Sequence, residues 1–128
     1  MTARLHVIVC TGGRGFTDMS VVERAFDPWL MCILGVVVGC ARGADALVRE
    51  YCRLYGLPIR VCYADWSQHG KAAGIIRNKE MIAEAAHIAQ DTGSRLRMFA
   101  FPGGRGTAHA RQVFSQLTLT EPECYQDD

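Results

Sequence analysis

Short apolar runs alternate with longer stretches of helical periodicity along this 128-residue chain. The short runs are rich in β-branched and aromatic residues, which favours strands, and each precedes a stretch in which apolar residues recur every three or four positions. Pro28 is expected to break the first helix and Gly56 to end the second. The predicted strands are 5–10, 35–40, 59–64 and 96–101, and the predicted helices are 18–34, 46–56, 75–89 and 108–117.

This alternation predicts an α/β fold in three layers, with a mainly parallel sheet covered by helices on both faces. Residues 117–121 (LTLTE) are a candidate fifth strand, so the sheet has four or five strands. We expect a single domain over residues 1–121 and a loose C-terminal tail over 122–128.

Composition narrows the classes of function. The chain has 14 Lys+Arg against 13 Asp+Glu, and this net charge of +1 argues against a general nucleic-acid binder. No apolar stretch is long enough for a membrane span or a signal peptide, which favours a cytoplasmic protein without a membrane partner. The six cysteines form no C-x-x-C pair and have no metal-ligand spacing with the histidines, so we expect reduced thiols, no metal site and no cofactor.

Four unusual segments follow the four predicted strands: GGRGF (12–16), ARGAD (41–45), DWSQHGKAAG (65–74) and PGGRGT (102–107). The carboxyl ends of parallel strands meet at one edge of the sheet, near the topological switch point where ligands bind. Glycine lets backbone approach a ligand closely, arginine offers a planar fork of donors, and helix N-termini attract anions. The sequence therefore predicts a phosphate-binding site at this edge.

Two familiar phosphate-binding motifs do not fit these segments. The first glycine turn has Asp18 where the dinucleotide-binding motif G-x-G-x-x-G needs its last glycine, and no acidic residue ends the second strand. A P-loop is excluded because the chain contains no G-K-[ST].

Together the segments resemble the YspA-like branch of the SLOG superfamily, which is related to the Lonely-guy phosphoribohydrolases and to DprA/Smf. The resemblance implies a Rossmann-like domain, commonly dimeric, that holds a nucleotide-derived ligand at its strand ends. The matching stretches are GGRGFTD (12–18), VVGCARGADAL (37–47), ADWSQHGKAAGIIRNKEM (64–81) and AFPGGRGTA (100–108).

The resemblance to Lonely-guy hydrolases also contains a departure. Their PGG-x-GT-x-x-E motif corresponds to Pro102 through Ala110, and their R-K-x-x-M motif corresponds to Arg77, Asn78 and Met81. Ala110 stands where those enzymes carry a glutamate, so their activity does not transfer to this chain.

The expected ligand-binding residues come from all four segments and from the helix that follows the third segment. Phe16 and Trp66 are candidates to stack on a base, although either could equally be plain packing. Arg77 could contact the ligand or pair with an acid on its own helix. The full set is Gly13, Arg14, Phe16, Gly43, Ala44, Asp45, Trp66, Lys71, Arg77, Asn78, Pro102, Gly103, Gly104, Arg105, Gly106 and Thr107.

Asp65 and Asp45 are the candidate catalytic residues. Asp65 follows a predicted strand beside Trp66 and has no evident capping role, which makes it a candidate for a general base or a contact to a ribose hydroxyl. Asp45 opens a helix, where the dipole alone explains a carboxylate. The N-terminal position of Asp18 has the same explanation.

Two classes of function remain open. One is an enzyme that cleaves an N-glycosidic or phosphate-linked bond in a nucleotide-derived ligand, which the acids at the binding edge favour. The other is a non-catalytic protein that senses or sequesters such a ligand, for example an ADP-ribose-type signal in bacteria–phage conflict. A single-stranded DNA module is a weaker alternative because the chain is nearly neutral. We also expect a homodimer or a higher homo-oligomer, because the helices after the second and third strands carry apolar residues on more than one face.

Overall fold

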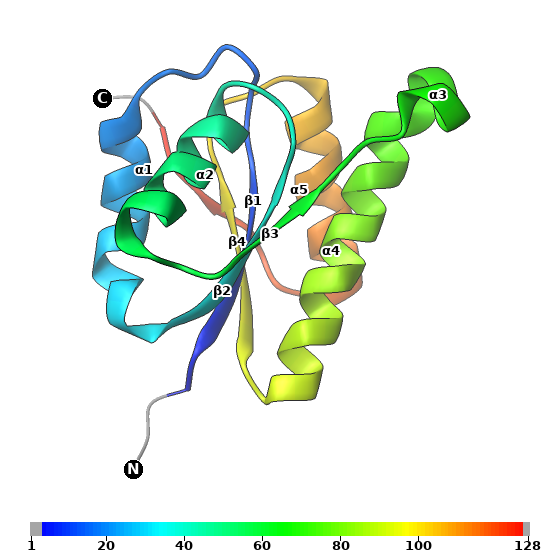
Figure 1. Ribbon diagram of the computed structural model, residues 1–128. Helices are drawn as coiled ribbons and strands as arrows, with labels where there is room; N and C mark the ends of the chain where they lie inside the picture. The colour runs from blue at the N-terminus through cyan, green and yellow to red at the C-terminus, as the bar shows by residue number, and fades with distance from the viewer. Residues whose placement is uncertain (1–3, 127–128) are drawn as a thin grey trace.

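A five-stranded parallel sheet forms the centre of the computed structural model, which describes residues 4–126 (Figure 1). Each pair of neighbouring strands runs in parallel, in the order β3-β2-β1-β4-β5. The strands are β1 (His6–Thr11), β2 (Ile33–Gly39), β3 (Ile59–Cys62), β4 (Arg95–Ala100) and β5 (Glu123–Cys124).

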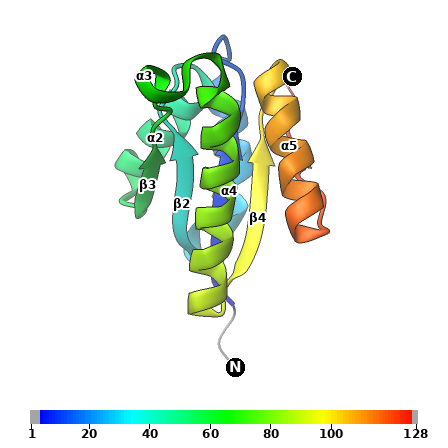
Figure 2. The ribbon, with the colours of Figure 1, turned by 90° about the vertical axis from the view of Figure 1, so that its right-hand side faces the viewer.

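Helices cover both faces of the sheet and confirm the predicted three-layer, Rossmann-like α/β fold. Figure 2 shows α4 lying across one face with α5 beside it, while α1 and α2 lie behind the sheet. The α-helices are α1 (Met19–Phe26), α2 (Ala44–Tyr55), α3 (Trp66–His69), α4 (Ala73–Thr92) and α5 (Arg105–Thr118), and two 3₁₀ helices cover Asp27–Cys32 and Gly70–Ala72. None of the helices within residues 4–126 has the length and apolar character of a membrane span.

The core has one part on each side of the sheet, because the central strands are covered from both faces. All six residues of β1 are buried. On the side of α1 and α2, the rings of Phe26, Tyr51 and Phe99 pack together. On the side of α4 and α5, Ile82 and Phe114 belong to the second part.

The sequence located most elements, with errors at their ends. As predicted, Pro28 interrupts the first helix: α1 ends at Phe26 and a 3₁₀ turn follows. Gly56 ends α2 in the left-handed conformation, also as predicted. Helix α5 begins at Arg105, inside the glycine turn that was expected to be a loop.

The fifth strand lies further along the chain than expected. Residues 117–118 belong to α5, and β5 forms at Glu123–Cys124, which corrects the prediction of a strand over 117–121. The segment after residue 121 is not loose, because Tyr125 packs against the rings of Phe99 and Phe101. Residues 127–128 of the predicted tail lie outside the described residues.

The strand order places a topological switch point between β1 and β4. The chain runs outward from β1 to β2 and β3, and α4 then returns it to β4 on the other side of β1. Crossovers therefore leave the two central strands in opposite directions, which opens a crevice at their carboxyl ends. The glycine turns after β1 and β4 both lie at this crevice.

Candidate ligand-binding site

A pocket of about 430 Å³ lies at the carboxyl edge of the sheet, at the switch point. It receives residues from the end of β1 and the turn after it, from the loop after β2 and the start of α2, from the segment between β3 and α4, from α4 itself and from the start of α5. Ten predicted ligand-binding residues line it: Gly13, Arg14, Asp45, Trp66, Lys71, Arg77, Asn78, Gly104, Gly106 and Thr107.

The two glycine turns pack directly against each other. The backbone N–H of Gly13 donates a hydrogen bond of 2.8 Å to the carbonyl of Pro102. A Cβ atom on Gly13 would lie 2.9 Å from the Cα of Gly103, closer than such contacts occur. Glycine is therefore required here for the contact between the turns, which explains part of the repeated glycine pattern without a ligand.

A third turn joins this contact at the start of α2. Gly43 has a φ of 75° and lies against the carbonyls of Gly13 and Arg14. The N–H of Ala44 donates to the carbonyl of Gly13 over 3.0 Å. Gly43 and Ala44 were predicted to bind ligand, but they are not among the residues that line the pocket. They instead contact the turn after β1.

The start of α5 presents backbone donors that no side chain caps. Gly104 is the N-cap residue, and no side chain caps this helix end. Model Cβ atoms on Gly104 and Gly106 would meet nothing within 4 Å, in contrast to those on Gly13 and Gly103. The first N–H groups of a helix have no partner within the helix, so those of α5 are available to a ligand in the pocket.

Three cations and one acid line the pocket. Arg14 comes from the turn after β1, Lys71 from the turn before α4, and Arg77 from α4; the acid is Asp45. The excess of positive charge and the N-terminus of α5 both favour the binding of an anion in this pocket.

Arg77 has a defined position at the end of β2. Its Nε donates to Oδ1 of Asn78 over 3.3 Å, and its Nη1 lies 3.9 Å from the Sγ of Cys40. A Cβ on Gly39 would lie 2.8 Å from the guanidinium carbon, so glycine leaves the space that this side chain occupies.

Asn78 connects α4 to the first turn of α5. Its buried amide donates to the carbonyl of Gly106 over 3.1 Å and lies 3.4 Å from Nδ1 of His109. Because its Oδ1 accepts from Arg77, the amide orients both the arginine and the helix end. Asn78 lines the pocket, while its amide oxygen and nitrogen form hydrogen bonds with other protein groups.

Asp45 is buried beneath the pocket, with 5% of its surface exposed. Burial raises the pKa of its carboxyl, while the charge of Arg77 and the hydrogen bond from the N–H of Ala41 act in the opposite direction. Arg49 also holds this loop, because its Nη1 donates to the carbonyls of Gly39 and Ala41, each over 2.9 Å. The sequence reasoning did not select Arg49.

Asp65 has the capping role that was not evident from the sequence. It is the N-cap of α3, and its carboxylate accepts hydrogen bonds from the Gln68 N–H and the Ser67 hydroxyl. These bonds lower the pKa of the carboxyl, with the Ser67 hydroxyl the largest cause. Asp65 is exposed and is absent from the pocket lining, which corrects the expectation of a general base.

The two candidate stacking residues have opposite environments. Phe16 is 6% exposed and stacks on Phe101 inside the core, so its ring is not available to a base and that expectation was wrong. Trp66 is 50% exposed and lines the pocket. Pro102, Gly103 and Arg105 are near the site in sequence but are not among its lining residues.

Several lining residues were missed by sequence reasoning. Gly74, Ile75 and Met81 lie on α4 at helical spacing from Arg77 and Asn78, and this spacing could have identified them. The other missed residues end β1 or follow β2: Cys10, Thr11, Gly12 and Ala41.

The fold and the site define an α/β protein with a cationic pocket at the switch point of a parallel sheet. Residues 6–69 match the family model described as "YspA, cpYpsA-related SLOG family". Over 112 residues the chain is 35% identical to "Gene 61 protein" of Mycobacterium phage D29, a match covering 80% of this chain and 82% of the relative. No solved structure matches the chain.

The chain therefore belongs to the YspA, cpYpsA-related SLOG family. Membership in this family suggests a nucleotide-related ligand. The matched residues include the first two glycine-containing turns and the whole of α3, and the PGGRGT turn lies outside the match.

Proposed function

We propose that the pocket binds a phosphorylated, nucleotide-derived small molecule, with a phosphate at the N-terminus of α5. The observation that carries this proposal is the uncapped start of α5, where Gly104 and Gly106 leave the backbone open toward a pocket with three cationic side chains. Free N–H groups, a helix dipole and an arginine fork form a phosphate site of a general kind.

Arg77 is the side chain best placed to complete this site. Its Nε donates a hydrogen bond to the side-chain amide of Asn78, and this amide in turn donates to the carbonyl of Gly106 in the first turn of α5. The guanidinium and the helix end are therefore held in one arrangement before a ligand arrives. Preorganised donors of this kind lose little conformational freedom on binding, which supports affinity for the phosphate.

Binding without cleavage agrees best with the side chains of the site. Ala110 is buried in the core beside α4, so a methyl group occupies the position of the Lonely-guy glutamate. Asp65 caps α3 and Asp18 caps α1, which leaves Asp45 as the acid in the pocket lining. We propose sequestration or sensing, of an ADP-ribose-type signal for example, as the function of the pocket.

Cleavage of the ligand is a second candidate, and Asp45 favours it. This carboxyl is buried at the pocket, and burial raises its pKa in the direction that favours proton exchange with a ligand. If the protein is an enzyme, Asp45→Asn abolishes turnover and leaves binding intact. Recovery of AMP and ADP-ribose unchanged after long incubation with the wild-type protein contradicts this candidate.

Calorimetric titration with AMP tests the binding function. Loss of a charge-assisted hydrogen bond costs about 1.5–3 kcal/mol, so Arg77→Ala is expected to weaken binding roughly ten- to a hundred-fold. Lys79→Ala is the matched control, because Lys79 is an exposed cation on the same helix that is absent from the pocket lining. Equal losses in the two variants, or no binding of AMP and ADP-ribose by the wild-type protein, contradict the proposal.

A further inference from the structure

Trp66 lies beside the pocket on a short, separately capped helix. Figure 1 shows α3 standing out from the body of the molecule at the start of α4. Asp65 holds the start of this helix, because its carboxylate accepts hydrogen bonds from the backbone N–H of Gln68 and from the Ser67 hydroxyl. The ring lies against Gly74, where a Cβ would be 3.7 Å from it, and half of the tryptophan surface is exposed.

Arg14 faces this ring across a gap. Its guanidinium carbon is 5.8 Å from the centre of the Trp66 ring, and both residues line the pocket. Arg14 is exposed and forms no hydrogen bond or ion pair with any of residues 4–126. The second pair of this kind, Arg97 and Trp29, has a separation of 4.0 Å.

The separation of Arg14 from the Trp66 ring decides whether a flat group fits between them. The distance of 5.8 Å runs from the guanidinium carbon to the centre of the ring and lies within the range of a loose cation–π contact, whereas close stacking brings atoms to about 3.5–4 Å. A flat ring between the two groups needs roughly twice one contact, about 7 Å. Movement of the exposed Arg14 side chain away from the ring provides that space, because long exposed side chains change rotamer rapidly.

We propose that the planar base of the ligand inserts between the Trp66 ring and the Arg14 guanidinium. This inference rests on the proposed function and adds the second end of the ligand to the phosphate end at α5. Phe16 is excluded as the platform by its burial, and Tyr63 is exposed but does not line the pocket. Trp66 combines exposure, a fixed backbone and a position in the lining.

The proposal defines a class of ligand. Every base has a flat π surface, so stacking on an aromatic residue tolerates different bases. The pocket is therefore expected to distinguish phosphorylated nucleosides from phosphorylated sugars that lack a base. It is expected to distinguish adenine from uracil only weakly.

The test compares AMP with ribose 5-phosphate. Stacking of one base contributes about 1–3 kcal/mol, which corresponds to roughly 5- to 150-fold in affinity. We expect this preference for AMP in the wild-type protein, and nearly equal affinities for the two compounds in Trp66→Ala. The chain has two tryptophans, so Trp29→Phe leaves Trp66 as the single fluorophore, and AMP is expected to quench it while ribose 5-phosphate does not.

The outcomes separate this inference from the proposed function. If both compounds bind in an Arg77-dependent manner and Trp66→Ala keeps the preference for AMP, the base lies elsewhere and the inference is wrong, while the phosphate site stands. Absence of binding by either compound contradicts both. Should Trp29→Phe prove unstable in a thermal melt, the Trp66→Ala affinities decide alone.

Discussion

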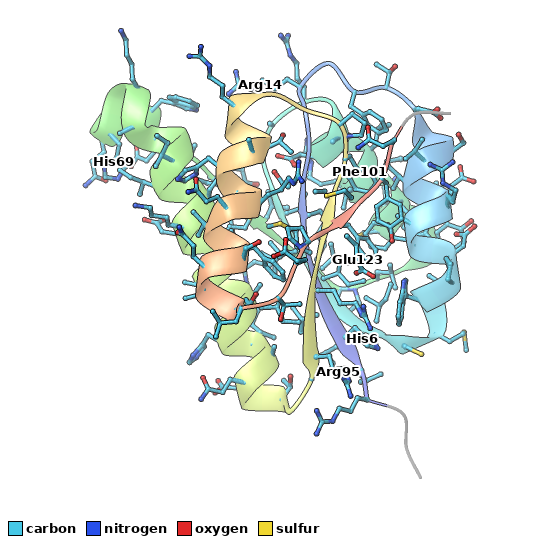
Figure 3. All side chains as sticks on the ribbon, turned by 180° about the vertical axis from the view of Figure 1, so that it is seen from behind. His6, Arg14, His69, Arg95, Phe101 and Glu123 are labelled. Atoms are coloured by element: carbon cyan, nitrogen blue, oxygen red, sulfur yellow. The ribbon has the colours of Figure 1, made fainter. Side chains whose placement is uncertain are left out.

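Residues 4–126 contain two arginine–tryptophan pairs, and the pairs differ in whether the arginine donates hydrogen bonds to other protein groups. Arg97 lies 4.0 Å over the Trp29 ring, donates from Nε to Nδ1 of His6 over 3.2 Å, and donates from Nη1 to Glu123 over 3.1 Å. Arg14 lies 5.8 Å from Trp66 and has no hydrogen-bond partner among residues 4–126. Figure 3 shows Arg14 at one end of the molecule, and His6 and Glu123 nearer the other.

The difference separates two roles for the same pair of side chains. The Arg97 pair joins β1, β4, β5 and the turn before β2, so its interactions are internal and stabilise the fold. The Arg14 pair lines a pocket with its donors free. An arginine whose donors are used has a structural role, and one whose donors are free beside an exposed aromatic ring is available to a ligand.

Arg97→Ala is expected to have the largest effect on stability. It removes the contact to Trp29 and leaves the Glu123 carboxylate unpaired, while one oxygen of that carboxylate is already buried without a hydrogen bond. We expect a loss of about 2–3 kcal/mol in the free energy of unfolding, measured by urea denaturation. Unchanged stability would contradict a structural role for this pair.

Arg14→Ala is expected to give the opposite pattern. Removing an exposed arginine with no internal hydrogen bond leaves unfolding unchanged, while AMP binding weakens about tenfold through loss of the stacked cation. Calorimetry and urea denaturation on the same sample measure both quantities. A clear loss of stability with unchanged affinity would remove the distinction between the two pairs.

Asp65 substitutions test whether capping of α3 matters to ligand binding between Arg14 and Trp66. Asparagine caps helices about as well as aspartate, whereas alanine does not, so Asp65→Asn is expected to keep AMP affinity and Asp65→Ala to lose a few-fold. The same titration measures both variants. If Asp65 were instead a general base, Asp65→Asn would abolish turnover even though asparagine still caps the helix.

The pH dependence of stability that arises from His6, the acceptor of Arg97, is expected to be the smallest effect. Burial, followed by the charges of Arg97 and Arg95, lowers the pKa of His6 below its ordinary value of 6.5. The unfolded chain therefore binds a proton at a higher pH than the folded protein, and stability falls as the pH drops through 6.5, until folded His6 is also protonated. His6→Asn keeps an acceptor for Arg97 without the titration, so its stability is expected to change less between pH 7 and 5.5 in urea denaturation. Parallel curves for the two proteins would contradict this assignment.

The sequence predicted the arrangement of the edge better than the roles of individual side chains. Alternation of strands and helices places the four loops together whatever their detailed structure, which is why Gly13 and Gly104 were found, whereas Arg77 and Asn78 came from the resemblance to the R-K-x-x-M motif. The environments of Phe16 and Trp66 depend on contacts with distant segments, since Phe16 packs on Phe101 after β4. No local pattern reports that contact.

The role of Asp65 was within reach of the sequence, in contrast to that of Phe16. An aspartate at the start of DWSQ, after a strand, fits an N-cap, and the short helix that it begins was not predicted. The fifth strand was missed for a different reason. Two residues form it, and pairing with β4 places them there, while the residues at 117–118 continue α5.

The central claim is that a ligand phosphate binds the open start of α5, and amide chemical shifts of ¹⁵N-labelled protein titrated with AMP test it most directly. A hydrogen bond to phosphate moves an amide proton downfield, so we expect the largest shifts at Arg105, Gly106 and Thr107, and in Arg77→Ala the same shifts at roughly ten- to a hundred-fold higher AMP concentration. Saturable AMP binding that leaves those three amides unmoved would contradict the claim.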